Sequence, residues 1–116
     1  MPWNTPEYVR KWFILCKEEF HMETIVLHVY YTCKPGRAAA FVQAVKADGL
    51  LEAVRAEDGC LLYDYHLSCE APDTVVLIEQ WRDAAALEKH LAQPHMEDLR
   101  RLKGEYALDT KLERYE

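Results

Sequence analysis

The sequence predicts an α+β domain in which one antiparallel sheet carries its helices on a single face. Strand-like and helix-like patterns follow one another in the order β-α-β-β-α-α-β between residues 24 and 115. Short turn sequences separate several of these patterns: Lys34-Pro35-Gly36, Glu57-Asp58-Gly59 and Ala71-Pro72-Asp73. This order of elements is the split βαβ arrangement of a ferredoxin-like fold.

The first half of the predicted domain is a strand, a helix and a second strand. Residues 24–33 are β-branched and aromatic, which predicts a strand. Residues 37–54 follow a helical pattern, and Asp48-Gly49 is expected to kink or break it. Residues 60–69 predict the second strand, whose odd positions share one face: Leu61, Tyr63, Tyr65 and Leu67.

The second half supplies a third strand, two short helices and a final strand over residues 107–115. Residues 74–81 contain an unbroken apolar run, from which we expect burial on both faces. Asp83 is the predicted N-cap of the next helix, and Pro94 is expected to open another that ends near Gly104. The apolar stripe of the first of these helices is predicted to contain Ala84, Leu87, His90 and Leu91.

Residues 1–21 are predicted to form a helical extension, separate from a single domain over residues 22–116. Thr5 can cap this helix and Pro6 can open it. We expect the extension to dock on the body of the protein or on a partner subunit, and a lid over a pocket is the alternative.

The composition excludes several classes of function. The 116 residues carry a net charge of −6, so neither nucleic acid nor an anionic membrane is the expected partner. The four glycines form no pattern that binds a dinucleotide or a phosphate. The four cysteines form no C-x-x-C pair and are expected to be reduced. No apolar run suits a membrane span or a signal peptide, so we expect a cytoplasmic protein.

A candidate site lies where the third strand meets the following helix. Glu79 and Trp81 are two residues apart and share one face of the strand, while His90 lies on the apolar stripe of the helix. His95 follows at the next helix start. A purely structural role is the alternative for each of them. We expect no metal, because the two histidines lack H-x-x-x-H spacing and straddle a break in the helix.

The sheet face without helices would be exposed in a monomer. The apolar third strand and the tyrosines of the second make such exposure unfavourable, since large apolar patches mark contacts. We therefore expect a homodimer packed through its sheet faces.

The element order and its turn residues resemble the antibiotic biosynthesis monooxygenase (ABM) family of dimeric α/β-barrel proteins. The pattern Pro-Asp-x-x-Val-x-Ile-Glu-Gln-Trp from Pro72, continued by His-Leu-x-x-Pro-His-Met from His90, is similar to its quinol monooxygenase branch. The further matching features are Pro35-Gly36, Phe41, Glu57-Asp58-Gly59-Cys60, Tyr63 and Leu87.

The resemblance implies oxidation of a small electron-rich aromatic, of the quinol or anthrone kind, by O₂ without a cofactor. His90 would be the catalytic base or donor, and Tyr63, Trp81 and Phe41 would offer flat walls for the ring. His95 and Glu79 would orient His90 or gate the pocket. An isomerase of the same fold and a non-catalytic dimer that binds an aromatic ligand are the alternatives.

One branch of the family is disfavoured by its residues. Haem-degrading members resemble each other in an asparagine, a tryptophan and a histidine, and the corresponding positions here are Val29, His90 and Arg100. None of the three matches, so we do not expect haem breakdown.

Overall fold

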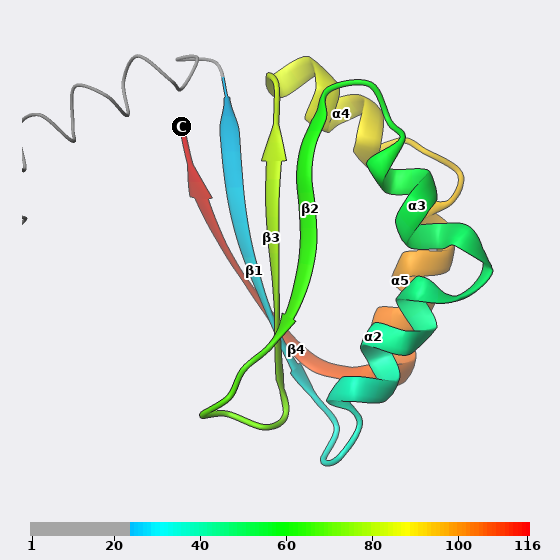
Figure 1. Ribbon diagram of the computed structural model, residues 1–116, viewed down its shortest axis with the longest axis vertical. Helices are drawn as coiled ribbons and strands as arrows, with labels where there is room; N and C mark the ends of the chain where they lie inside the picture. Colours follow the sequence, from blue (N-terminus) through cyan, green and yellow to red (C-terminus); the bar gives the residue numbers. More distant parts are fainter. Residues whose placement is uncertain (1–23) are drawn as a thin grey trace, which may run out of the picture.

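A four-stranded antiparallel sheet carries all the described helices on one face (Figure 1). This computed structural model describes residues 24–116, so the predicted extension over residues 1–21 lies outside the described part. The strands lie in the order β2-β3-β1-β4, which is the order of a ferredoxin-like fold and confirms the predicted class. Their bounds are β1 Ile25–Cys33, β2 Cys60–Leu67, β3 Thr74–Trp81 and β4 Ala107–Tyr115.

The helices connect the strands close to the predicted boundaries. Asp48 (φ 57°) and Gly49 (φ 73°) both adopt left-handed backbone, which confirms the break predicted there. Pro94 lies in the turn before the last helix rather than inside it, so that helix begins and ends about two residues later than predicted. The bounds are α2 Ala38–Lys46, the 3-10 turn η2 Ala47–Gly49, α3 Leu50–Arg55, α4 Ala84–Leu91 and α5 Met96–Tyr106.

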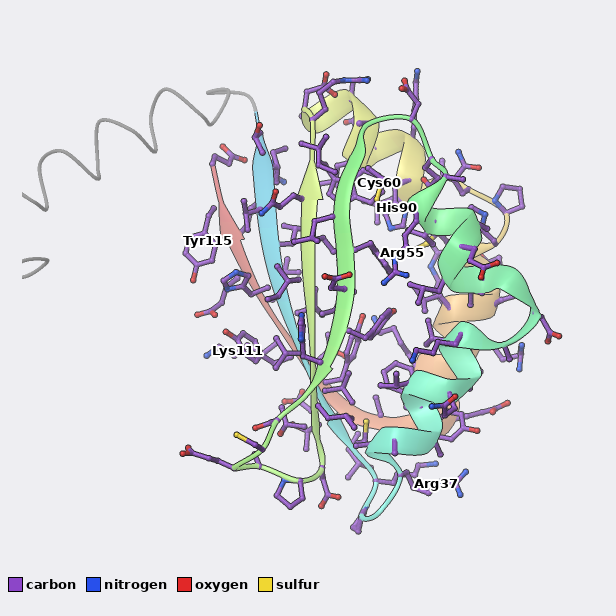
Figure 2. The ribbon with its side chains drawn as sticks, viewed as in Figure 1. Arg37, Arg55, Cys60, His90, Lys111 and Tyr115 are labelled. Carbon is purple, nitrogen blue, oxygen red and sulfur yellow. The ribbon has the colours of Figure 1, made fainter. Side chains whose placement is uncertain are left out.

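The core lies between the helices and the inner face of the sheet. Every second residue of β1 and β3 points into it, so both strands alternate between buried and half-buried positions. The prediction that β3 is buried on both faces is therefore wrong for the single chain. Its outer positions Val76, Ile78 and Gln80 are half-buried, because no described element covers that side of the sheet (Figure 2).

Two predicted apolar faces are only partly buried. In β2, Tyr63 is buried and Tyr65 is half-buried, but Leu61 at the register shift and Leu67 at the strand end are exposed. In α4, Asp83 caps the helix by accepting a hydrogen bond from the N–H of Ala86 at 2.8 Å, as predicted. The helix buries Ala86, Leu87 and His90 and leaves Ala84 and Leu91 exposed, so the predicted stripe is rotated slightly.

The described part of the chain holds free thiols at Cys33, Cys60 and Cys69. None of the helices seen between residues 24 and 116 has the length and apolar character needed to cross a membrane.

Candidate functional site

A cavity of about 400 Å³ separates α4 and α5 from the inner face of β1 and β4. Its β1 wall is apolar, and its β4 wall carries Leu112, which is 57% exposed because no described helix covers that strand. Three of the predicted site residues line it: Tyr63, Glu79 and His90.

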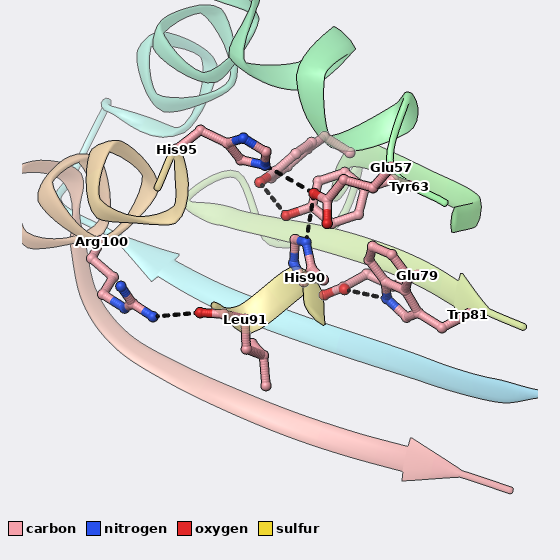
Figure 3. Close-up of polar contacts among 9 residues, drawn as sticks. Glu57, Tyr63, Glu79, Trp81, His90, Leu91, His95 and Arg100 are labelled. Atoms are coloured by element: carbon pink, nitrogen blue, oxygen red, sulfur yellow. Dashed lines mark hydrogen bonds and ion pairs between the residues drawn. The ribbon is translucent and has the colours of Figure 1, made fainter. Parts of the chain in front are cut away.

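His90 is fixed on two sides. Its ring stacks on Trp81, with centroids 4.4 Å apart, and its Nδ1 lies 2.9 Å from Oε2 of Glu57 (Figure 3). An ionised carboxylate only accepts hydrogen bonds, so this contact makes Nδ1 the protonated nitrogen. Nε2 finds no hydrogen-bond partner among residues 24–116 and is the nitrogen left for a ligand in the cavity.

Burial lowers the pKa of His90 below its usual 6.5, although the neighbouring Glu57 carboxylate opposes that change. The imidazole is therefore neutral near pH 7. A neutral ring with a donated Nδ1–H presents a lone pair on Nε2, which is the form a general base requires.

Glu79 is a buried carboxyl group on the floor of the same cavity. In the sheet register it lies between Leu27 of β1 and Tyr63 of β2, and one of its oxygens accepts a hydrogen bond from Trp81 Nε1 at 2.9 Å. Burial raises its pKa from 4.5 to about 7, against the opposing effects of the Trp81 hydrogen bond and the charge of Lys103. The cavity thus holds a neutral imidazole beside a carboxyl group whose pKa is about 7.

The other predicted site residues do not line this cavity. Trp81 is fully buried beneath His90, and Phe41 is fully buried against Tyr31, Tyr65 and Tyr106. His95 also lies outside it: its Nε2 contacts Oε2 of Glu57 at 2.9 Å.

Glu57 is the site residue that sequence reasoning missed. We predicted that His95 and Glu79 would orient His90 or gate the pocket. In the structure Glu57 contacts His90 Nδ1, while Glu79 accepts a hydrogen bond from Trp81. The signal available was its place in the Glu-Asp-Gly turn, one of the features that matched the family.

Glu57, His90 and His95 are also the described residues best placed to hold a metal ion, with one ligand atom from each lying within 4.8 Å of the others. In this structure the three are joined by hydrogen bonds of 2.9 Å that both end on one oxygen, Oε2 of Glu57. A metal at about 2.0–2.2 Å from each ligand would require that carboxylate to move aside.

The fold is that of a small α+β domain with a cavity between its sheet and its helices. Residues 24–102 match the antibiotic biosynthesis monooxygenase family, and the chain belongs to it. The crystal structure of PA3566 from Pseudomonas aeruginosa is similar, with a TM-score of 0.71, 34% identity, and 83% of this chain and 96% of that chain covered.

Two curated relatives carry activity names. "Putative monooxygenase YcnE" of Bacillus subtilis is 33% identical over 73 residues, which are 63% of this chain and 75% of that protein. "Probable quinol monooxygenase YgiN" of Escherichia coli K12 is 40% identical over 55 residues, and the match spans 40% of this chain and 53% of that protein. These matches support a monooxygenase as the general class.

Proposed function

We propose that this protein is a cofactor-independent monooxygenase that oxidises a small electron-rich aromatic, such as a quinol or an anthrone, with O₂. One observation carries the proposal: His90 lines the cavity with its Nε2 unpartnered among residues 24–116, while Glu57 holds its Nδ1. The name of YgiN supports a quinol as the substrate class.

The reaction begins with a proton transfer. A phenolic or enolic hydroxyl of the substrate donates to Nε2 of His90, and the proton moves to the imidazole, which Glu57 stabilises as the cation. The resulting anion gives one electron to O₂, and the two radicals combine at a ring carbon to form a peroxide. The peroxide anion takes back the proton from His90. The hydroperoxide then loses water together with the hydrogen of the same ring carbon, so one oxygen atom stays on the ring as a carbonyl and the other leaves as water.

The lining of the cavity supports this chemistry. Leu27, Val29, Leu87, Met96 and Leu99 give this part of the cavity low polarity, which strengthens the interaction of the anion with fixed charges. The ring of Tyr63 lies beside that of His90, with 5.7 Å between the two ring centroids. An aromatic substrate can pack against the edge of the Tyr63 ring.

The test is oxygen uptake with a panel of hydroquinones and anthrones. His90→Ala is expected to lower kcat by about 10²–10⁴-fold, because it removes the base. The matched control is Lys89→Ala, since Lys89 precedes His90 on α4, is exposed and lies outside the cavity. Uptake no faster than autoxidation, or equal activity in His90→Ala and the wild type, would refute the proposal.

Glu57→Gln tests how His90 is held. Glutamine cannot stabilise the imidazolium and can donate to Nδ1, so it favours the wrong tautomer, and we expect kcat to fall on the order of 10²-fold while KM changes little. A rise in KM with unchanged kcat would assign Glu57 to substrate binding instead.

A second candidate is an isomerase, because Glu79 and His90 in one cavity form a pair of proton carriers. Product analysis separates the two functions: isomerisation proceeds without O₂ and leaves the mass of the substrate unchanged. A ligand that raises Tm without turnover under either condition would favour the non-catalytic binder.

We also propose a homodimer that buries the outer face of the sheet. In this face, paired neighbours of β1 and β3 are half-buried and largely apolar or aromatic, and Lys111 and Tyr115 of β4 point the same way (Figure 2). An apolar sheet face of this kind favours association with a second copy.

A further inference from the structure

The cavity is basic, although the chain as a whole is acidic. Arg100 and Lys103 of α5 and Arg114 of β4 line it, and Glu79 is the one acidic residue in the lining formed by the described chain. The full chain has 14 basic and 20 acidic residues, so three basic side chains to one acidic side chain reverses the overall balance.

The helix places two of these cations at the cavity because of its periodicity. Met96 and Leu99 are buried and line the cavity, and Arg100 and Lys103 follow them by four residues on the same face of α5. Arg114 comes from the opposite wall, where it pairs with Leu27 in the register of β1 and β4. Two separate elements therefore direct cations into one cavity.

Within the part of the chain that the structure describes, none of the three cations pairs with a buried carboxylate. Arg100 pairs with Glu97 and donates to the carbonyl of Leu91 at 3.1 Å, which holds its guanidinium at the cavity (Figure 3). Arg114 pairs with Glu116 at 2.6 Å. Both carboxylates are more than half exposed, and exposed ion pairs of this kind contribute little stability, so a ligand can replace them.

Lys103 is the cation whose charge acts on Glu79, the carboxyl group on the floor of the cavity. It is half-buried, its Nζ lies 5.6 Å from the ring centre of Tyr31, and its charge reaches Glu79. Within residues 24–116 it makes no ion pair with any carboxylate. A partly buried ammonium beside an apolar cavity favours a negatively charged ligand group.

We propose that Arg100, Lys103 and Arg114 form a subsite for an acidic substituent, a carboxylate or a phosphate, on an aromatic ligand. The assignment rests on the proposed function, because it assumes that the same ligand presents its hydroxyl to His90. The preferred substrate is then a hydroxylated aromatic that carries an anionic group, and a neutral quinol binds less tightly.

Binding, rather than turnover, tests the subsite. The probes are 2-naphthol, 2-naphthoate and 2-naphthyl phosphate, titrated into the full chain by calorimetry at low and high salt. At least one anion is expected to bind on the order of tenfold more tightly than 2-naphthol, with an advantage that shrinks as salt rises. The two anionic arms distinguish a carboxylate from a phosphate. Anions that bind no more tightly than 2-naphthol, or no binding by any probe, overturn the proposal.

Charge-neutralising variants assign the effect to these residues. Arg114→Gln and Lys103→Gln are each expected to weaken anion binding about tenfold and to leave the Kd of 2-naphthol within about twofold. Arg101→Gln is the matched control, because Arg101 lies on the same helix and pairs with Asp98 and Glu105 outside the cavity. A control variant that loses as much anion affinity as Arg114→Gln overturns the assignment.

The outcomes separate this proposal from the proposed function. Tighter anion binding without oxygen uptake by any hydroxylated aromatic overturns the monooxygenase and leaves the subsite standing. Oxygen uptake that depends on His90, with equal affinity for neutral and anionic probes, supports the monooxygenase and overturns the subsite.

Discussion

Replacing Glu79 with glutamine is expected to remove a pH-dependent penalty from the stability of this protein. Glu79 is 6% exposed, and burial raises the pKa of its carboxyl group from 4.5 to about 7. Glutamine has nearly the same shape, carries no charge, and can still accept the hydrogen bond from Trp81 Nε1. The substitution therefore removes the titration and keeps the packing.

The sign follows from proton binding. Between pH 4.5 and about 7 the folded protein keeps the Glu79 proton and the unfolded chain has lost it, so stability falls as pH rises through this window. Below pH 4.5 both states are protonated and the penalty vanishes. The difference between the folded and unfolded pKa of Glu79 corresponds to about 3 kcal/mol. The free energy of unfolding of the wild type falls by this amount by pH 8, and that of the variant does not.

The assay is urea unfolding of both proteins at fixed protein concentration between pH 4.5 and 8. Burial lowers the pKa of His90, which makes stability fall toward acid pH, but this contribution is present in both proteins and cancels in their difference. Glu88→Gln on the exposed face of α4 is the control for losing one negative charge. A difference between Glu79→Gln and the wild type that stays constant across the pH range would refute the reasoning.

Three further predictions concern stability and assembly. Gly59→Ala is expected to destabilise the fold by about 2–4 kcal/mol, because φ is +86° and the new Cβ would lie 2.4 Å from that of Ala86. The control Gly104→Ala, in an open helical position, should stabilise the fold by about 0.5–1 kcal/mol. Equal changes in the free energy of unfolding for the two variants, measured with urea, would contradict the prediction. Asp83→Ala should cost about 1 kcal/mol and Asp83→Asn much less, since asparagine keeps the cap; equal losses would exclude the cap as the cause. Sedimentation should show a dimer for the wild type at micromolar concentration and a monomer for Ile78→Lys; a monomeric wild type would refute the dimer.

The fold was predictable because its signals are local. The β-branched runs, the Asp48-Gly49 break and the Asp83 cap depend on residues that are neighbours in the sequence, and the structure confirms each of them. The burial of β3 was not predictable, because an apolar run has the same sequence pattern whether its second face packs against its own chain or against a partner.

The site was predictable only in part, because its contacts connect distant positions. His90 and Glu79 were found from the spacing of a strand and a helix, but Glu57 reaches His90 across 33 residues and His95 across 38. Phe41 and Trp81 show the opposite limit: an aromatic residue in a strand or helix fills a core as readily as it lines a cavity, and here both are fully buried.

Mutations in strand β4 can change the ligand preference of the cavity with little effect on the stability of the fold. It supplies Thr110, Leu112 and Arg114 to the cavity, yet none of its residues is fully buried, and the family match ends at residue 102, before it begins. Substitutions at such exposed positions typically change stability by no more than about 0.5 kcal/mol. New ligand preferences can therefore evolve by mutation of this one strand, while Glu57, His90 and the core remain unchanged.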